Sequence, residues 1–284
     1  MGTSVCAEHV QPQIKSVLVA ITQDQVQLPS LPDLVVHIRD EINSPKSTAQ
    51  SIAKLVARDP ALSANILRYA NSPLYGSISS VRTLPLAVQR LGLHLVHSLT
   101  LATIARQLFH ASSAWTATQL NRVWSHSVRT AALSSVLAPR FKVDSDVALL
   151  AGLLHDMGSF VMLVHLEGTP DLFVNEDRLD CLLYATRVEA GLALASHWNL
   201  PSEVVDTIKT HNEMSKGGVM QAPSAPELVR AASWFLTDAC LRGDVVVRQR
   251  ENALGRLGFA PDEDLLADPA VLDKVDAIVQ LLRG

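Results

Sequence analysis

Three side chains have the types and spacing for metal chemistry: His126, His155 and Asp156. The adjacent pair lies in the otherwise apolar segment 148–160, and His126 precedes it inside a separate helical pattern. Neighbouring residues of a helix point about 100° apart, so one ion can still touch both members of the pair. Imidazoles and a carboxylate are ligands for Zn, Mn or Fe, and a metal-bound water attacks phosphate esters. The alternative is a buried polar pair that does no chemistry.

The elements that must position these residues are predicted to be helices. Aromatic residues make up only 5% of the chain, and the best β-like run, 244–250, fits a helix equally well. Helical signals are frequent: Asp59 is a cap before Pro60, and apolar residues then follow on one face. The predicted fold class is therefore all-α, with almost no sheet and at least ten helices in two packed subdomains.

A polar stretch at 110–119 is the predicted boundary between the two subdomains. It divides the chain into an N-terminal helical subdomain, 1–112, and a second helical subdomain, 113–284, that carries all three candidate ligands. The groove between the subdomains is the expected place for a partner peptide or a small ligand.

Net charge, cysteine count and the length of apolar runs indicate which classes of protein the chain does not belong to. The formal net charge is −4, from 24 basic and 28 acidic residues, which argues against generic binding to nucleic acid or to an anionic membrane. The three cysteines are odd in number and far apart, so a disulfide framework is not expected and a reducing compartment is the simpler interpretation. No apolar run is judged to approach 18 residues. The predicted localisation is cytoplasmic, without membrane contact.

The order of motifs in the chain resembles the HDOD family, the HD-related output domains of bacterial signalling proteins. The resemblance covers roughly residues 25–240, and its most specific part is DPALSANILRYANSPLYG. The other stretches that carry it are LPSLPDLVVHIRDEI, VRTLPLAVQRLGLHLVHSLTLA, VWSHSV, AGLLHDMG and HWNLPSEVVDTIKTHN. It implies an all-helical fold whose second half is HD-like, a bacterial source, and a regulatory role, usually without catalysis.

The sequence departs from an active HD site at the other expected ligand positions. Ser233 stands where the resemblance places a late Asp, and Ser159 stands where HD-GYP relatives have a Lys. Arg187 stands where those relatives have a His, and a cation at that position repels a metal. The later His-His pair of those relatives is His211-Asn212 here. His126, His155 and Asp156 therefore form a degenerate metal site, compatible with no cofactor or one weakly held divalent ion.

The remaining polar residues have a structural interpretation. Asp156 is predicted to accept a hydrogen bond from His126 or His155 in a structural polar core, and His211 to be a partly exposed residue at a helix end. Three tryptophans are predicted to lie in the core: Trp124, Trp198 and Trp234.

The predicted function is a non-catalytic bacterial signal-transduction module that binds a protein partner, a nucleotide or another small ligand. One alternative is a metal-dependent HD-type phosphohydrolase. A second alternative is a DNA-binding regulator, because the helical pattern around Gly92 faintly resembles a helix-turn-helix. The second helix of that pattern is mainly Leu, Val and Ala, which favours burial over contact with DNA.

Overall fold

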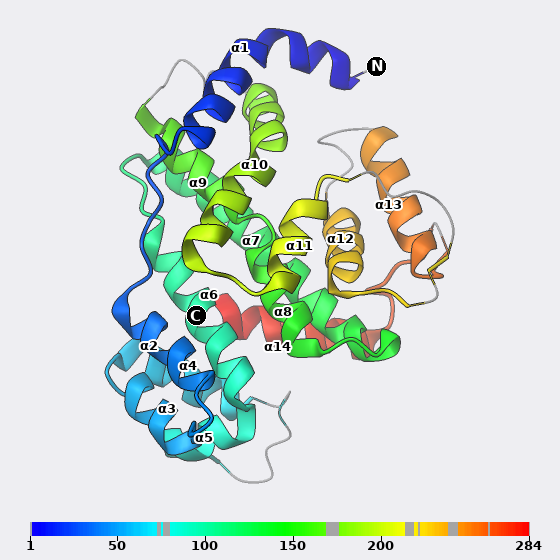
Figure 1. The fold of residues 1–284 in the computed structure, drawn as a ribbon. Helices are drawn as coiled ribbons and strands as arrows, with labels where there is room; N and C mark the ends of the chain where they lie inside the picture. The colour runs from blue at the N-terminus through cyan, green and yellow to red at the C-terminus, as the bar shows by residue number, and fades with distance from the viewer. Residues whose placement is uncertain are drawn as a thin grey trace. The chain divides into compact units, whose positions relative to one another are not determined.

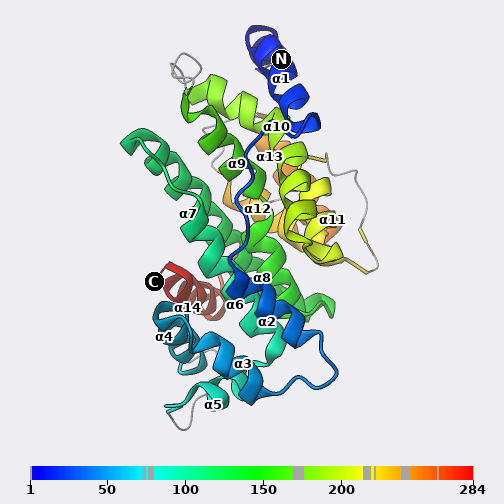
Figure 2. The same ribbon diagram turned by 60° about the vertical axis from the view of Figure 1, so that its left-hand side comes forward.

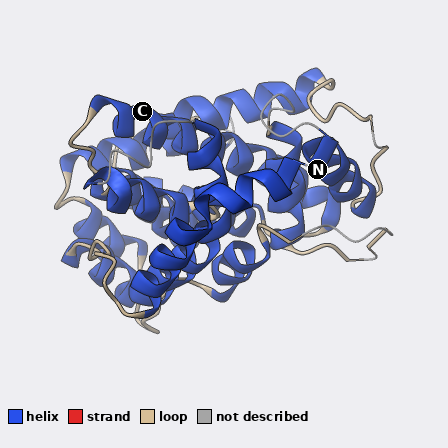
Figure 3. Cartoon of the chain, turned by 90° about the horizontal axis from the view of Figure 1, so that it is seen from above, coloured by secondary structure: helices blue, strands red, loops and turns tan. Residues whose placement is uncertain are grey.

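The computed structural model describes residues 2–72, 75, 80–168, 176–213, 219–220, 222–237, 244–260 and 262–283. Throughout these ranges the regular elements are helices and no strand occurs, so the predicted all-α class is confirmed (Figure 3). The α-helices run from α1 to α14, which also confirms the expectation of at least ten. The β-like run at 244–250 lies inside α13.

The first compact unit comprises residues 1–30 and 109–263. Its α-helices are α1 (Gly2–Thr22), α7 (Ala114–Leu137), α8 (Ser145–Leu154), α9 (Met157–His165), α10 (Glu176–Trp198), α11 (Ser202–Thr210), α12 (Ala225–Leu236) and α13 (Asp244–Arg256). Short 3-10 turns, η2 (Ala138–Phe141) and η3 (Leu166–Gly168), follow α7 and α9. Within this unit α7 packs on α8 and α12, and α10 packs on α9 and α1 (Figure 1).

The second compact unit comprises residues 31–108 and 264–284. It holds α2 (Asp33–Ile42), α3 (Ala49–Val56), α4 (Pro60–Ala70), α5 (Leu84–Leu91), α6 (Leu93–Leu108) and α14 (Pro269–Arg283). The C-terminal helix α14 lies beside α4 (Figure 2), and Arg68 donates to the carbonyl of Leu281 at 2.7 Å.

The two compact units are each built from two separate stretches of the chain, whereas the predicted subdomains, 1–112 and 113–284, are continuous. The change of unit at Phe109 lies close to the predicted boundary, but both ends of the chain are exchanged between the units. The cause is packing between elements far apart in the sequence, because α1 packs on α10 and α14 packs on α4.

The segment that carries the His-Asp pair is the central core segment of the first unit. Asp144 caps α8, since its side chain accepts from the amides of Asp146 and Val147. His155 and Asp156 form the turn where α8 ends and α9 begins. Contrary to the expectation from the sequence, Ser145–His165 is long and apolar enough to cross a membrane, but 89% of its most apolar 18-residue stretch is buried inside the protein.

Two glycines allow the helices around this turn to approach closely. A Cβ on Gly152 would lie 2.5 Å from the Cα of Ala131 on α7. A Cβ on Gly158 would lie 1.7 Å from the carbonyl oxygen of Arg187 on α10. The backbones of α7 and α10 therefore pass directly against the α8–α9 segment.

The three tryptophans are core residues, as predicted. Trp124, Trp198 and Trp234 are buried. Phe160 packs against Trp124 edge to face with ring centroids 6.3 Å apart, and the indole of Trp198 donates to the carbonyl of Pro29 at 2.7 Å. These rings fix α7, α9 and α10 around the His-Asp turn.

Although the sequence did not favour a disulfide framework, Cys181 is disulfide-bonded in the structure. Cys181 lies on α10. Cysteine count and spacing did not predict the bond, because distance along the chain does not determine which thiols meet in a fold. The predicted reducing compartment therefore loses its support from the cysteines.

The cap of α4 leads to a first stability prediction. Asp59 precedes Pro60, and its carboxylate accepts from the amide of Leu62 at 2.9 Å. We expect Asp59→Ala to lower the free energy of unfolding by about 1 kcal/mol, because an N–H group at the start of α4 loses its acceptor. Asp59→Asn keeps an acceptor and should cost less. Urea unfolding of both variants checks this, and equal losses would contradict the capping role.

His97 on α6 leads to a prediction of pH dependence. Burial, followed by smaller effects of Arg39 and His94, lowers its pKa to about 4. Because the folded-state pKa lies below the unfolded value, the unfolded chain binds the extra proton. Stability is therefore fully present above about pH 6.5 and is lost as the pH falls towards 4.

The contribution of His97 to this loss is up to about 1.4 kcal/mol per pH unit. We expect His97→Leu to show a shallower decline of the free energy of unfolding between pH 6.5 and pH 4.5, measured by urea unfolding. A decline parallel to that of the parent would show that His97 is protonated equally in both states.

Candidate functional site

Four helices, α7, α10, α11 and α12, and the turn between α8 and α9 bring the candidate residues together in the first unit (Figure 1). We call the resulting set the polar core; it consists of His126 on α7, His155 and Asp156 between α8 and α9, Arg187 on α10, His211 at the end of α11, and Ser233 on α12. The residues that the sequence singled out as ligands and as replacements therefore meet in one place.

The three histidines lie in a row. The ring centroids of His126 and His155 are 5.5 Å apart, and those of His155 and His211 are 4.6 Å apart. His211 was predicted to be a partly exposed residue at a helix end. It does lie at the end of α11, but the residue is buried, with 4% exposed. α11 packs against both α8 and α12, and this packing encloses the ring.

The hydroxyl of Ser233 reaches the first histidine of the row. Its Oγ lies 3.0 Å from Nε2 of His126, and Oγ1 of Thr130 lies 3.5 Å from the same nitrogen. Position 233 therefore faces His126, as expected of the position where an active site keeps a carboxylate. In this chain it supplies a neutral hydroxyl.

The partners of Asp156 differ from the prediction. Its Oδ1 accepts from the hydroxyl of Ser159 at 2.6 Å, and its Oδ2 pairs with Nη1 of Arg187 at 3.5 Å. The prediction that His126 or His155 donates to Asp156 is wrong. The donors are two of the residues that depart from the HD pattern: Ser159 reaches the carboxylate from the next turn of the chain, and Arg187 reaches it from the facing helix α10.

Arg187 joins this carboxylate to the end of α11. Its Nε and Nη2 donate to Oδ1 of Asn212 at 2.9 and 2.7 Å. The amide of Asn212 donates in turn to the carbonyl of Tyr184 at 2.6 Å. The sequence did not predict the part played by Tyr184. It contributes its backbone carbonyl, and every residue type has one, so the type of the residue gives no indication of this contact.

The histidines of the polar core are held neutral by their surroundings. Burial, with the neighbouring His155 as a second cause, lowers the pKa of His126 to about 3. Burial also lowers the pKa of His155. The pKa of His211 is lowered by burial first and by the positive charge of Arg187 second. Asp156 and Arg187 therefore form the charged pair of a core whose imidazoles are uncharged at neutral pH.

The residues present do not fit a divalent metal. Within the described ranges, no group of three or more His, Cys, Asp or Glu side chains is placed to hold an ion. Both oxygens of Asp156 already accept from Ser159 and Arg187, and the guanidinium adds a positive charge beside the carboxylate. We derive no hydrolytic step through a metal.

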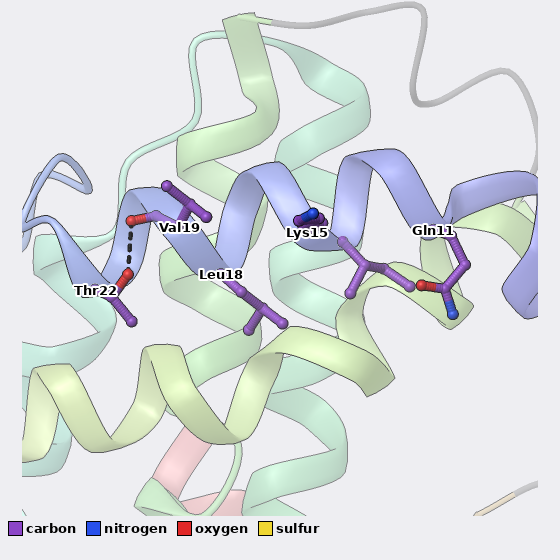
Figure 4. A pocket seen from close by; sticks show the side chains of 6 residues that line it. Gln11, Lys15, Leu18, Val19 and Thr22 are labelled. Carbon is purple, nitrogen blue, oxygen red and sulfur yellow. Dashed lines mark hydrogen bonds between the residues drawn. The ribbon is translucent and has the colours of Figure 1, made fainter.

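An open pocket lies elsewhere in the unit, along one side of α1 (Figure 4). It is lined by Gln11, Ile14, Lys15, Leu18, Val19 and Thr22. None of these lining residues is a histidine or a carboxylate, so this pocket offers no acid–base or metal chemistry of the HD type.

The second helix of the faint helix-turn-helix pattern is α6, and most of it is buried. Its buried side chains include Leu95, Leu99, Thr100 and Leu101. A recognition helix needs exposed polar and basic residues along its DNA-facing side. α6 instead supplies apolar core.

A family model, the HDOD domain, matches residues 28–214. The chain belongs to the HDOD family. The match covers most of the chain and includes His126, the His155-Asp156 pair, Arg187 and His211, whereas Ser233 lies beyond it.

Solved structures share this HDOD fold. A crystal structure from Shewanella amazonensis SB2B, provisionally named a metal-dependent phosphohydrolase, aligns with a TM-score of 0.83 at 24% identity over 96% of this chain and 98% of that one. An HDOD domain protein of unknown function from Geobacter sulfurreducens aligns with a TM-score of 0.63 at 22% identity, over 94% and 99% of the two chains. These likenesses establish the fold.

Curated relatives are longer than this HDOD chain. An uncharacterised protein of Treponema pallidum is 28% identical over 233 residues, which are 77% of this chain and 42% of that protein. Ribonuclease Y of Lactobacillus gasseri is 27% identical over 127 residues, 45% of this chain and 19% of that enzyme. The chain thus spans less than half the length of either relative.

Proposed function

We propose that this HDOD chain is a non-catalytic module of bacterial signal transduction that binds a protein partner or a small ligand. The observation that carries the proposal is that both carboxylate oxygens of Asp156 are already bound, one by the hydroxyl of Ser159 and the other by the guanidinium of Arg187. A carboxylate held by an internal hydroxyl and an internal cation is not available to a catalytic metal. A fold relative from Marinobacter aquaeolei VT8, provisionally named a signal transduction protein, has the biological context proposed here.

The phosphohydrolase and DNA-binding alternatives have less support. The polar core has one carboxylate where a hydrolytic metal needs more negative charge, and α6 is buried where a DNA reader needs an exposed helix. Localisation in the cytoplasm stays part of the proposal, and it rests on the family context alone.

A binding experiment tests the proposal. The immobilised chain is incubated with lysate of its source bacterium, and any retained protein or small molecule is purified and titrated back by calorimetry. We expect saturable binding that the folded Asp156→Asn variant keeps, because Asp156 serves the core and not the partner. The proposal fails if no purified candidate binds and the chain instead hydrolyses phosphodiesters in a reaction that Asp156→Asn abolishes.

A further inference from the structure

His155 retains the environment of a metal-ligating histidine. Its Nδ1 lies 2.7 Å from the carbonyl oxygen of Gly152, and a carbonyl can only accept, so Nδ1 carries the proton. In the neutral ring Nε2 is then a bare lone pair, and this atom is buried without a hydrogen-bond partner. A backbone carbonyl behind one ring nitrogen is the usual device that orients the other towards a metal.

His211 adds further unused nitrogens beside His155. Both of its ring nitrogens are buried without a hydrogen-bond partner, and its ring packs edge-on against His155. Buried polar atoms without partners are uncommon and call for an explanation. The unpartnered nitrogens of His155 and His211 are explained if the chain has kept the imidazoles of a metal site and replaced the metal ion with another cation.

The replacement for the central cation is visible in the contacts of Arg187. Its side chain is only 17% exposed and pairs through the guanidinium with Asp156, whose side chain is 8% exposed. Its other nitrogens are fixed on Asn212. A guanidinium keeps its charge at every relevant pH, so it neutralises the carboxylate permanently.

We infer that Arg187 is the resident cation of a latent metal site, and that Arg187 and Ser233 are the two side chains that keep this site free of metal. The remaining ligands, His126, His155 and Asp156, are already gathered in the polar core. The inference goes beyond the proposed function, because metal affinity of the variants below does not depend on whether the chain has a partner.

Both positions lie close to the remaining ligands. The backbone of Arg187 passes so close to Gly158 that a Cβ there would lie 2.6 Å from the carbonyl carbon of Arg187. The backbone at position 187 on α10 thus lies against Gly158, which follows Asp156 by two residues in the chain. A short side chain at 187 therefore begins close to Asp156. At position 233 the Oγ atom already lies 3.0 Å from Nε2 of His126, so a carboxylate at this position reaches the same nitrogen-lined space.

The test is titration of Mn²⁺ and Zn²⁺ into the wild-type chain and the double variant Arg187→His/Ser233→Asp by calorimetry, with elemental analysis of the dialysed proteins. We expect no stoichiometric binding by the wild type and about one equivalent in the double variant. The affinity should rise at least tenfold, and the metal should raise the melting temperature of the double variant, since a ligand stabilises the state it binds.

Matched variants control for charge and for folding. Arg122→His/Ser233→Asp makes the same types of change but removes an arginine that pairs with Asp180 outside the polar core, so it should gain no metal. Arg187→Gln/Ser233→Asp keeps an amide donor towards Asn212, and it replaces the first double variant if that one does not fold.

Two results would overturn the inference. One is a wild-type chain that binds one equivalent of Mn²⁺ or Zn²⁺ and loses it on Asp156→Asn. The other is a folded Arg187→His/Ser233→Asp or Arg187→Gln/Ser233→Asp variant, shown by circular dichroism, that takes up no metal.

Discussion

We expect that replacing Asp156 by Ala lowers the free energy of unfolding by about 3 kcal/mol and the melting temperature by roughly 5–10 °C. The carboxylate accepts from Ser159 and pairs with Arg187 inside the polar core. Its removal strands a largely buried guanidinium and a buried hydroxyl, and breaking one side of a buried pair costs more than the pair itself contributes. Urea unfolding and calorimetric melting measure the effect.

Asp156→Asn is the matched control. Its carboxamide oxygen still accepts from Ser159, but the charge opposite Arg187 is gone, so the loss should be smaller than for Asp156→Ala. If both variants melt like the parent and lose binding of a partner or ligand, Asp156 is a recognition residue and the structural interpretation of the polar core is wrong.

Replacing Gly158 by Ala has an effect of similar size for a different reason. The added Cβ would lie 1.7 Å from the carbonyl oxygen of Arg187 and 2.7 Å from the amide nitrogen of Gly191. Both contacts are with backbone atoms, so α9 and α10 must separate and the Arg187–Asp156 pair must lengthen. Overpacking of this kind costs about 3 kcal/mol, and we expect much of the protein to be lost to aggregation on expression.

Gly255→Ala serves as the control for Gly158→Ala. Gly255 lies in α13, and a Cβ there meets no atom within 4 Å. Alanine is the better helix former by about 1 kcal/mol, so this variant should melt at or above the parent temperature. If Gly158→Ala melts like Gly255→Ala, α9 and α10 do not approach as closely as the structure places them.

The fold was predictable from the sequence because caps and apolar periodicity are local. Asp59 and Pro60 mark the start of α4, and Asp144 marks the start of α8, as their side chains and positions suggest. The exchange of chain ends between the compact units was not predictable. It depends on the apolar faces of α1 and α14 finding α10 and α4, and the amphipathic pattern of a helix does not say which partner it meets.

The members of the polar core were predictable, but their pairing was not. Residue types at expected positions identified His126, His155, Asp156, Arg187 and Ser233. The choice of donor to Asp156 depends on the turn geometry after α8 and on the reach of Arg187 across the Gly158 contact. The disulfide at Cys181 was missed for a similar reason, because spacing along the chain does not determine which side chains meet in the fold.

The metal content of the wild-type protein tests the central claim most directly. The chain is dialysed against Mn²⁺ or Fe²⁺, passed through a desalting column and measured by elemental analysis per mole of protein. A self-contained polar core, with Arg187 as the partner of Asp156, predicts well under one equivalent of either metal. Two equivalents, together with phosphodiester hydrolysis that Asp156→Ala abolishes, would contradict it.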